Sequence, residues 1–361
     1  MNEAALKKLP LALVYNNLYP WSSLNQFVDQ LVNTIAYKSD DGSLLAINKP
    51  FGVGTYTTHD LNSQKTNQDR VLSNIGGKPR YCISDALLPL TDHLNSPKPY
   101  KVLKGIDRYA SGLVLLTNDL NKHKVNLARS QQFTKINSLP PYGFRVITCG
   151  YPLTKSTSLF ERVGCELVEV DELGDHKEPV LSQNPGWSFK GKHKHKSLFQ
   201  VQLNVKKIER ELATALIEVH VSKMKWDFVR CYISSKTSFI LGDVRFSKRI
   251  REILGKRIQV SAFRSNHKFD DPYEPLSAEL QKILGVKRNS SIPLMLDHHE
   301  LCLRNFWGSK SQEKDLIIKS SYVPLHFAAT ACRLNLLDAL DSMSNTILDN
   351  HVEHNRSDAV A

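Results

Sequence analysis

The pattern of apolar and polar positions along the chain predicts both strands and helices. Short apolar or alternating runs bounded by Gly, Pro and polar residues are typical of β-strands. They occur at residues 44–53, 113–116, 144–150, 198–205, 215–221 and 293–303. Apolar residues at helical spacing predict helices at residues 24–37, 85–94, 120–133, 249–254, 276–284 and 328–348. Residues 229–233 fit either a helix or a strand.

The two ends of the chain differ in composition from its middle. Residues 1–40 lack arginine, and Glu3 is their only acid before Asp29. A mitochondrial presequence is poor in acids but rich in arginine, so we interpret this segment as an N-terminal extension whose targeting role stays open. Residues 311–361 carry the last helical pattern and are expected to form a C-terminal helical tail. Because no apolar run approaches the roughly 20 residues of a membrane-spanning helix, we expect no membrane span.

Composition narrows the class of protein. A hydrophobic content of 41% and a charged content of 23% are typical of a soluble globular protein. The six cysteines are scattered, and none forms a CxxC pair or a Cys/His cluster at metal-binding spacing. This usage fits a reducing compartment and argues against a disulfide framework or a structural zinc site.

The net charge of +12 is concentrated in one part of the chain. Residues 187–264 contain 18 Lys and Arg against 6 Asp and Glu, whereas residues 151–186 contain 3 against 7. The tail at 311–361 is also acidic, with 4 against 7. A basic charge gathered in one segment suggests a polyanionic partner, most often a nucleic acid, although a well-solvated surface is the alternative.

One stretch, residues 101–116, combines a polar turn with a buried strand. Asp107 lies close to Arg108, Ser111 and Gly112, just before an apolar run. A carboxylate on a turn that leads into a buried strand is held rigidly at a sheet edge, which is a common way to present a reactive group. An aspartate in such a place can equally be an ordinary turn residue. The sequence on either side of it is needed to choose between these two interpretations.

Five sequence blocks follow one another in an order that resembles the RluA-type pseudouridine synthases over residues 41–303. The blocks are Leu45-Ala-Ile-Asn-Lys-Pro-Phe-Gly-Val53, Gly105-Ile-Asp-Arg-Tyr-Ala-Ser-Gly-Leu-Val-Leu-Leu116, Lys223-Met-Lys-Trp-Asp-Phe-Val-Arg230, Ile240-Leu-Gly-Asp243 and Pro293-Leu-Met-Leu296. Each block alone is weak, whereas the ordered set is specific. Their spacing and the basic loop at 244–257 are most similar to the animal mitochondrial branch of the family.

The resemblance implies an α+β fold with a mixed, mainly antiparallel central sheet, flanking helices and a catalytic cleft, formed by residues 41–310. It implies that the protein isomerises specific uridines in RNA to pseudouridine, with Asp107 as the catalytic carboxylate and Arg230 as its partner. This chemistry requires no metal and no organic cofactor. The residues expected to contact the substrate are Phe144, Tyr142, Arg108, Lys225, Arg245, Lys248 and Arg249.

The resemblance also predicts partners and a compartment. The expected partner is RNA, either mitochondrial messenger, ribosomal or transfer RNA, together with RNA-granule or assembly proteins. The expected location is the mitochondrial matrix, and a cytoplasmic or nuclear location stays open.

Several positions depart from the family's usual residues. Gly105 stands where the family has an arginine, and Ala110 where it has a threonine. Asp227 and Phe228 replace a His-Gln pair. These departures support an alternative hypothesis, an RNA-binding factor for mitochondrial RNA or ribosome assembly whose catalysis is impaired.

Overall fold

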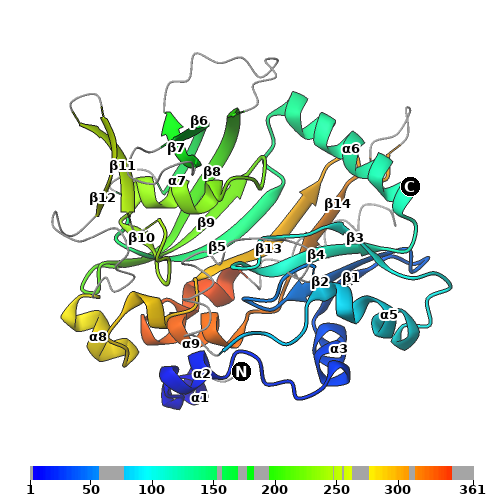
Figure 1. Ribbon diagram of the computed structural model, residues 1–361, viewed down its shortest axis with the longest axis horizontal. Helices are drawn as coiled ribbons and strands as arrows, with labels where there is room; N and C mark the ends of the chain where they lie inside the picture. The colour runs from blue at the N-terminus through cyan, green and yellow to red at the C-terminus, as the bar shows by residue number, and fades with distance from the viewer. Residues whose placement is uncertain are drawn as a thin grey trace, which may run out of the picture.

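The computed structural model describes residues 3–56, 77–152, 157–169, 177–182, 195–246, 248–253, 256–261, 276–308 and 314–343. Figure 1 shows the arrangement of their helices and strands. In chain order the elements are α1 (Glu3–Lys8), α2 (Leu11–Asn16), α3 (Leu24–Asn33), β1 (Ile35–Lys38), β2 (Leu44–Lys49), α5 (Ile83–His93), β3 (Lys101–Lys104), β4 (Ser111–Thr117), α6 (Leu120–Asn137), β5 (Tyr142–Cys149), β6 (Ser158–Glu169), β7 (Lys177–Ser182), β8 (Lys196–Glu209), β9 (Thr214–Val221), α7 (Phe228–Lys236), β10 (Phe239–Ile240), β11 (Lys248–Ile253), β12 (Lys256–Ser261), α8 (Ala278–Leu284), the 3₁₀ turn η3 (Asn289–Ser291), β13 (Leu296–Leu303), β14 (Leu316–Lys319) and α9 (Leu325–Arg333).

A large sheet runs through the molecule. Its strand order is β1-β2-β4-β13-β5-β9-β8-β6-β7, with β3, β10 and β14 attached beside this path. Among the described strands every pairing is antiparallel except that of β13 with β4. The late strand β13 therefore separates β4 from β5 and brings the two halves of the chain together. The predicted mixed, mainly antiparallel sheet with flanking helices is confirmed.

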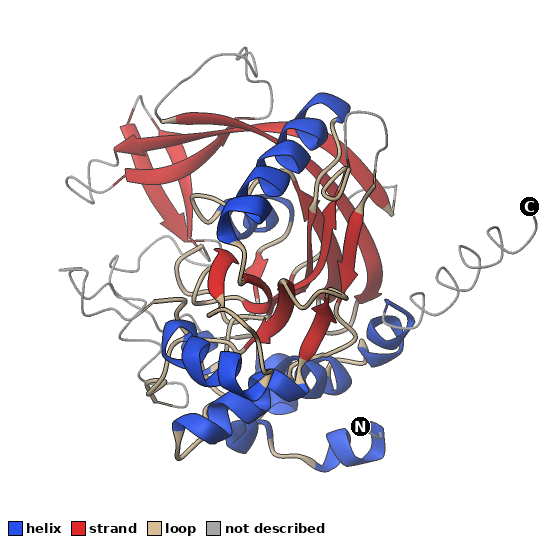
Figure 2. Ribbon diagram, turned by 90° about the vertical axis from the view of Figure 1, so that its right-hand side faces the viewer, coloured by secondary structure: helices blue, strands red, loops and turns tan. Residues whose placement is uncertain are grey.

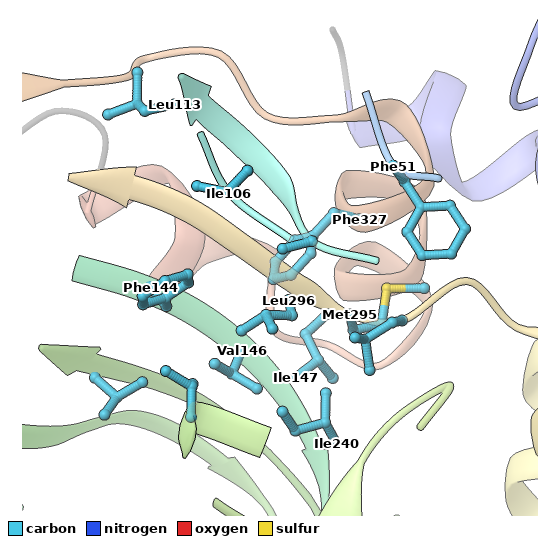
Figure 3. Packing of buried hydrophobic residues seen from close by; sticks show 14 of the residues in the cluster. Phe51, Ile106, Leu113, Phe144, Val146, Ile147, Ile240, Met295, Leu296 and Phe327 are labelled. Atoms are coloured by element: carbon cyan, nitrogen blue, oxygen red, sulfur yellow. The ribbon is translucent and has the colours of Figure 1, made fainter. Parts of the chain in front are cut away.

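The central strands are buried on both faces. Every residue of β4 and of β5 is buried. Figure 2 shows most helices gathered at one end of the sheet, with the long helix α6 lying across the strands. On one face the side chains of Phe144, Val146 and Leu296 lie together in the apolar core (Figure 3).

The two ends of the described chain pack on each other. Helices α1 and α2 contact α9, and Tyr15 and Thr330 share a hydrogen bond of 2.7 Å between their hydroxyl groups. The guanidinium of Arg333 donates to the carbonyl oxygen of Leu9 at 3.0 Å. The predicted boundary at residues 40–41 falls between β1 and β2, and that at residues 310–311 falls between β13 and β14. All four strands belong to the same sheet.

Three predicted helices differ in the structure. The helix expected at 24–37 ends at Asn33, and Ile35–Lys38 form β1, which pairs with β2. Residues 249–254 were expected to be helical because Ile250 and Ile253 are three residues apart, but residues 248–253 form β11 and pair with β12. That prediction is wrong, since hydrogen bonding to the next segment prevails over local spacing. The helix expected at 328–348 begins at Leu325 and ends at Arg333. A left-handed residue, Asn335 with a φ of 56°, precedes a second helix at 337–343.

Candidate active site

A cavity of about 300 Å³ opens between the loop before β4, the middle of β5 and the start of α7. Its lining includes both candidate catalytic residues, Asp107 and Arg230, and the predicted substrate residues Phe144 and Lys225. The structure thus brings together four of the nine predicted site residues, which come from two of the five sequence blocks and from β5. The lining adds a second carboxylate, Asp227.

Asp107 reaches the cavity from a rigid turn. Its side chain is exposed, and Oδ1 accepts a hydrogen bond of 2.7 Å from the backbone N–H of Tyr109. This local bond fixes the direction of the carboxylate, as in an Asx turn. Gly105 also lines the cavity, and a Cβ atom at this position would lie 3.0 Å from Oγ1 of Thr55.

A buried lysine fastens this loop to the sheet. Lys49, the last residue of β2, is 1% exposed, and its Nζ donates to the carbonyl oxygens of Ala110 at 2.6 Å and Arg108 at 3.3 Å. The same Nζ donates to the carbonyl oxygens of Val53 at 2.9 Å and Pro50 at 3.1 Å. Burial lowers the pKa of Lys49 to about 7, and the charge of the nearby Asp107 opposes this shift. The Asn-Lys-Pro block therefore positions the loop of the Asp107 block.

Gly112 allows β4 to lie directly against β13. Its φ is 111°, and a Cβ atom at this position would be 2.1 Å from the carbonyl oxygen of His298. Only glycine fits both the backbone conformation and the close approach. The glycine of the Ser-Gly-Leu motif is thus required where the parallel pair β4–β13 begins.

Arg230 lies at the centre of an ion-pair network. Its Nε and Nη2 donate to the two carboxylate oxygens of Asp243 at 2.8 and 2.7 Å, and its Nη1 lies 3.5 Å from Asp227. Burial alone would lower the pKa of Arg230, but the charge of Asp243 and its hydrogen bonds raise it. None of the described ion pairs joins Arg230 to Asp107. The charges of Asp243, Asp227 and Asp107 nevertheless all raise the pKa of Arg230. Arg230 is therefore held in place by Asp243 and lines the same cavity as Asp107.

Arg245, predicted to contact substrate, belongs to the same network. Its Nη2 lies 2.9 and 3.0 Å from the two oxygens of Glu178, and its Nη1 donates to Asp227 at 2.9 Å. Its guanidinium thus joins β7 to the start of α7. Lys248 and Arg249 lie on β11, where they pair with Ser261 and Val260 of β12, and their side chains lie outside the described part of the structure.

The two aromatic candidates on β5 occupy different places. Phe144 lines the cavity, and its ring lies 4.9 Å from that of His298. Tyr142 is two residues earlier on the same face of the strand but does not line the cavity. Burial raises the pKa of Tyr142, and a side-chain hydrogen bond with Gln131 of α6 opposes the rise. Phe144 is therefore placed to contact a base in the cavity, whereas Tyr142 lies under α6.

Three lysines have no carboxylate partner among the described ion pairs, and one of them, Lys225, lines the cavity. They are Lys104 at the end of β3 and Lys223 and Lys225 in the segment before α7. Burial lowers the pKa of each, and for Lys223, where the charge of Lys225 adds to the effect, the pKa falls to about 8. The ammonium of Lys225 stacks 3.8 Å above the ring centre of Trp226. The remaining candidate, Arg108, donates through Nε to the carbonyl oxygen of Gly52 at 3.3 Å.

One cluster elsewhere has the residue types of a metal site. Glu218, His220 and Glu300 offer ligand atoms within 4.8 Å of one another and line a separate cavity of about 340 Å³. Lys206 lies 2.8 Å from Glu218, and Lys319 lies 3.5 Å from Glu300. Because these ammonium groups already neutralise both carboxylates, the cluster is an ion-pair network across β8, β9, β13 and β14.

Among the described residues, no helix combines the length and the apolar character needed to cross a bilayer. This observation concerns helices only.

Sequence reasoning did not assign a role to three residues of the site. Lys49 and Asp243 lie within quoted blocks, but their burial and pairing depend on the folded structure. Asp227 was noted only as a departure from the family pattern. The sequence did contain a signal for this ion-pair network. Two acids and two arginines fall within the nineteen residues 227–245, and buried charges require partners of opposite sign.

Comparisons with known proteins match the fold. No protein-family model matches the sequence, and no curated protein matches it significantly. The structure of human RNA Pseudouridylate Synthase Domain Containing 4 aligns with a TM-score of 0.55 at 18% identity, over 86% of this chain and 97% of that chain. Human RNA Pseudouridylate Synthase Domain Containing 1 aligns with a TM-score of 0.41 at 12% identity, over 82% of this chain and 86% of that chain.

The sheet topology, the flanking helices and the carboxylate-bearing cavity define a mixed α+β protein. The first of the two alignments identifies its architecture. The chain has the pseudouridine synthase fold, as the sequence blocks predict.

Proposed function

We propose that this protein is an RNA pseudouridine synthase, an isomerase that converts specific uridines in RNA to pseudouridine. The observation that carries the proposal is the cavity of the pseudouridine synthase fold, in which Asp107, Phe144 and Arg230 converge from three separate elements. Site geometry, and not fold alone, is what argues for an activity.

The proposed chemistry begins at the glycosidic bond. The bond between N1 of uracil and C1′ of ribose must break, and C5 must then join C1′. The transition state for such a cleavage is oxocarbenium-like, so a carboxylate beside C1′ can stabilise it or attack it. Asp107 is exposed to the cavity and fixed by its bond from the Tyr109 N–H, which suits this role. Arg230, held by Asp243, places a positive charge in the same cavity as Asp107.

The substrate base must leave its stack to reach Asp107. A uridine within paired RNA becomes reactive only when it is extruded into a pocket. Phe144 lines the cavity and is backed by His298 at 4.9 Å, so we propose that its ring contacts the face of the extruded uracil. A cavity of about 300 Å³ is at the lower end of the range for small-molecule sites, which suits a single base.

Lys104, Lys223 and Lys225 are proposed to bind the RNA backbone. Burial lowers the pKa of each, and a phosphate group nearby would offset that effect by favouring the charged form. Proteins that neutralise phosphates with lysine and arginine bind nucleic acid strongly at low salt and weakly at high salt. Lys225 lines the cavity, and Lys104 and Lys223 are the chain neighbours of the lining residues Gly105 and Met224.

The finer proposal concerns the RNA and the compartment. The spacing of the blocks and the loop after Asp243 support mitochondrial messenger, ribosomal or transfer RNA as the substrate. They likewise support a location in the mitochondrial matrix and contact with RNA-granule or assembly proteins.

A second candidate function is RNA binding without catalysis. It is favoured by Phe228, whose ring stacks at 3.7 Å on Phe199 in the core and offers no polar group to a substrate. Gly105 also lacks the side chain that typical members place beside the catalytic aspartate. On this hypothesis the lysines would still bind RNA while no uridine would depend on Asp107.

Purified protein can distinguish the two functions. Wild-type protein, Asp107→Asn and Asp92→Asn are incubated with total RNA from cells that lack the protein, and the pseudouridine formed is measured by mass spectrometry. Asp92 is an exposed carboxylate on α5 and serves as the matched control. Activity in wild type and Asp92→Asn but not in Asp107→Asn is the expected result. Equal pseudouridine with all three proteins, or none with wild type, would contradict the proposed function.

A further inference from the structure

Two carboxylates enter the same cavity from different elements. Asp107 comes from the loop before β4, and Asp227 comes from the residue before α7. The two carboxylates lie close together, since the charge of Asp107 contributes to the raised pKa of Asp227. Two carboxyl groups in one site can take different roles in a reaction.

The backbone that carries Asp227 is strained. Trp226 and Asp227 have φ angles of 58° and 50°, both in the left-handed region that residues other than glycine seldom adopt. Such conformations cost on the order of 1–3 kcal/mol each and cluster at functional sites. The two consecutive residues turn the chain so that both side chains line the cavity.

Asp227 keeps contact with the cavity although it is paired. Its Oδ2 accepts from Arg245 at 2.9 Å, its Oδ1 lies 3.5 Å from Arg230, and its side chain is 18% exposed. Burial is the largest cause of its raised pKa, which the charge of Arg230 opposes and that of Asp107 reinforces. By contrast, Asp243 is 1% exposed, with both oxygens bound to Arg230. Asp227 is therefore the more accessible carboxyl of this network.

Pseudouridine formation must move a proton. Uridine carries hydrogen on C5 and none on N1, whereas pseudouridine carries hydrogen on N1 and none on C5. A base must therefore remove the C5 proton after C5 has joined C1′. Phe144, the cavity residue on β5, has no group that can accept a proton, and Lys225 and Arg230 are cationic.

We propose that Asp227 is the base that removes the C5 proton of the bound uracil. This role rests on the proposed function and adds a second reacting residue to it. The C5–C1′ bond has formed with the π electrons of C5=C6 at that point, and N1, which kept the electron pair of the broken N1–C1′ bond, is double-bonded to C6. Asp227 takes the C5 proton, the C–H electron pair restores C5=C6, and the N1=C6 pair returns to N1, which gains a proton from Asp227 or water. No oxidant, reductant or other reactant is consumed.

The two carboxylates thus divide the reaction. Asp107 acts at the sugar carbon, and Asp227 acts at the base. Arg245 joins Asp227 to Glu178 and fixes the direction of its carboxylate. Tyr109 also lines the cavity, and its phenol is the competing proton acceptor that the experiment must test.

The test measures proton removal at C5 directly. Total RNA from cells lacking the protein is labelled with either ordinary or [5-²H]uridine, and pseudouridine formation is followed with purified protein in excess over RNA. The variants are Asp227→Asn, Asp227→Glu and Tyr109→Phe. General base catalysis contributes on the order of 10²–10⁴-fold, so we expect Asp227→Asn to react at least about 10²-fold more slowly.

The isotope effect separates proton transfer from a structural role. If Asp227 is the base, deuterium at C5 slows Asp227→Asn more than it slows wild type. Asp227→Glu then recovers part of the rate, and Tyr109→Phe keeps the rate and isotope effect of wild type. A slow Asp227→Asn with the isotope effect of wild type would overturn the proposal, because distortion of the site slows both isotopes equally. Transfer of the enlarged isotope effect to Tyr109→Phe would overturn it too.

Two controls make every outcome decisive. If Asp227→Asn loses the circular dichroism spectrum of the native protein, the isotope effect is read from Asp227→Ser, for which the same enlargement is expected and its absence contradicts the proposal. If wild type forms no pseudouridine, the proposed function fails and this role fails with it. An active wild type with an unchanged Asp227→Asn refutes the role of Asp227 alone.

Discussion

At the scale of single residues, the site depends on how charges are held. Asp107 is presented by one hydrogen bond from its own turn, whereas Arg230 is buried and bound at two points by Asp243. Bidentate pairing of this kind fixes a guanidinium more firmly than a single contact can. The sequence placed Asp107, Arg230 and Phe144 in one site because they lie at family motif positions. It could not reveal that Asp243 is the direct partner of Arg230.

Replacing Arg230 by lysine tests this arrangement. Lysine keeps the charge but cannot make the two parallel hydrogen bonds, so it leaves Asp243 poorly satisfied in a buried place. We expect Arg230→Lys to lower the free energy of unfolding by roughly 2–4 kcal/mol. Urea denaturation followed by circular dichroism measures the loss.

Arg245→Lys is the matched control, because the side chain of Arg245 is 32% exposed and its ion pairs are more solvated. A loss of about 1 kcal/mol or less is expected for it. Equal losses in the two variants would show that the bidentate pair does not anchor the site.

At the scale of elements, one loop links the sheet to the chemistry. The loop before β4 is fastened through Lys49 of β2, whose ammonium meets four carbonyl oxygens. The Asn-Lys-Pro block lies at the end of β2, and the Asp107 block leads into β4, the neighbouring strand. The first block is therefore placed to hold the loop of the second.

Lys49→Met removes the donor and keeps an unbranched apolar stem. Four buried carbonyl oxygens lose one of their partners, so we expect a loss of stability of roughly 2–4 kcal/mol. The exposed Lys101 on β3 is the control, and Lys101→Met should change stability by less than about 0.5 kcal/mol. The same urea titration compares them, and a tolerated Lys49→Met would contradict the assigned role.

For three helices, the spacing of apolar residues along the segment was sufficient to predict the element. The predicted helices at 85–94, 120–133 and 276–284 are observed as α5, α6 and α8, because their apolar spacing agrees with their packing. Residues 229–233, which fit two states, form part of α7. The prediction at 249–254 failed because the deciding contacts are backbone hydrogen bonds to β12, which side-chain spacing along one segment does not encode.

At the scale of the whole molecule, distant parts of the chain complete one another. β13 enters the sheet between β4 and β5, and Tyr15 meets Thr330 across 315 positions. Such pairings could not be derived from periodicity, since no local rule sets which distant segments meet. The charge pattern was more informative, because the basic segment supplies Lys225 to the lining of the cavity and Lys223 two residues before it.

Salt dependence tests the proposed use of this charge. Binding of total RNA should weaken steeply with added salt, and Lys223→Gln should reduce the slope of log affinity against log salt by roughly 0.7–0.9, the share of one phosphate contact. Lys236 is the matched control, because it already pairs with Glu161 at 2.7 Å. Fluorescence anisotropy across a salt series gives both slopes. An unchanged slope for Lys223→Gln, or an equal change for Lys236→Gln, would contradict phosphate contact by Lys223.

The central claim is that uridines become pseudouridine through Asp107. The most direct measurement maps pseudouridine at single-nucleotide resolution in cells that lack the protein and in the same cells supplied with wild type or Asp107→Ala at equal levels. Crosslinking shows whether each protein still binds RNA. We expect some uridines to be modified in cells with wild type and unmodified in cells with Asp107→Ala, while both proteins crosslink to RNA. Pseudouridine at every site regardless of Asp107, with RNA binding intact, would contradict it.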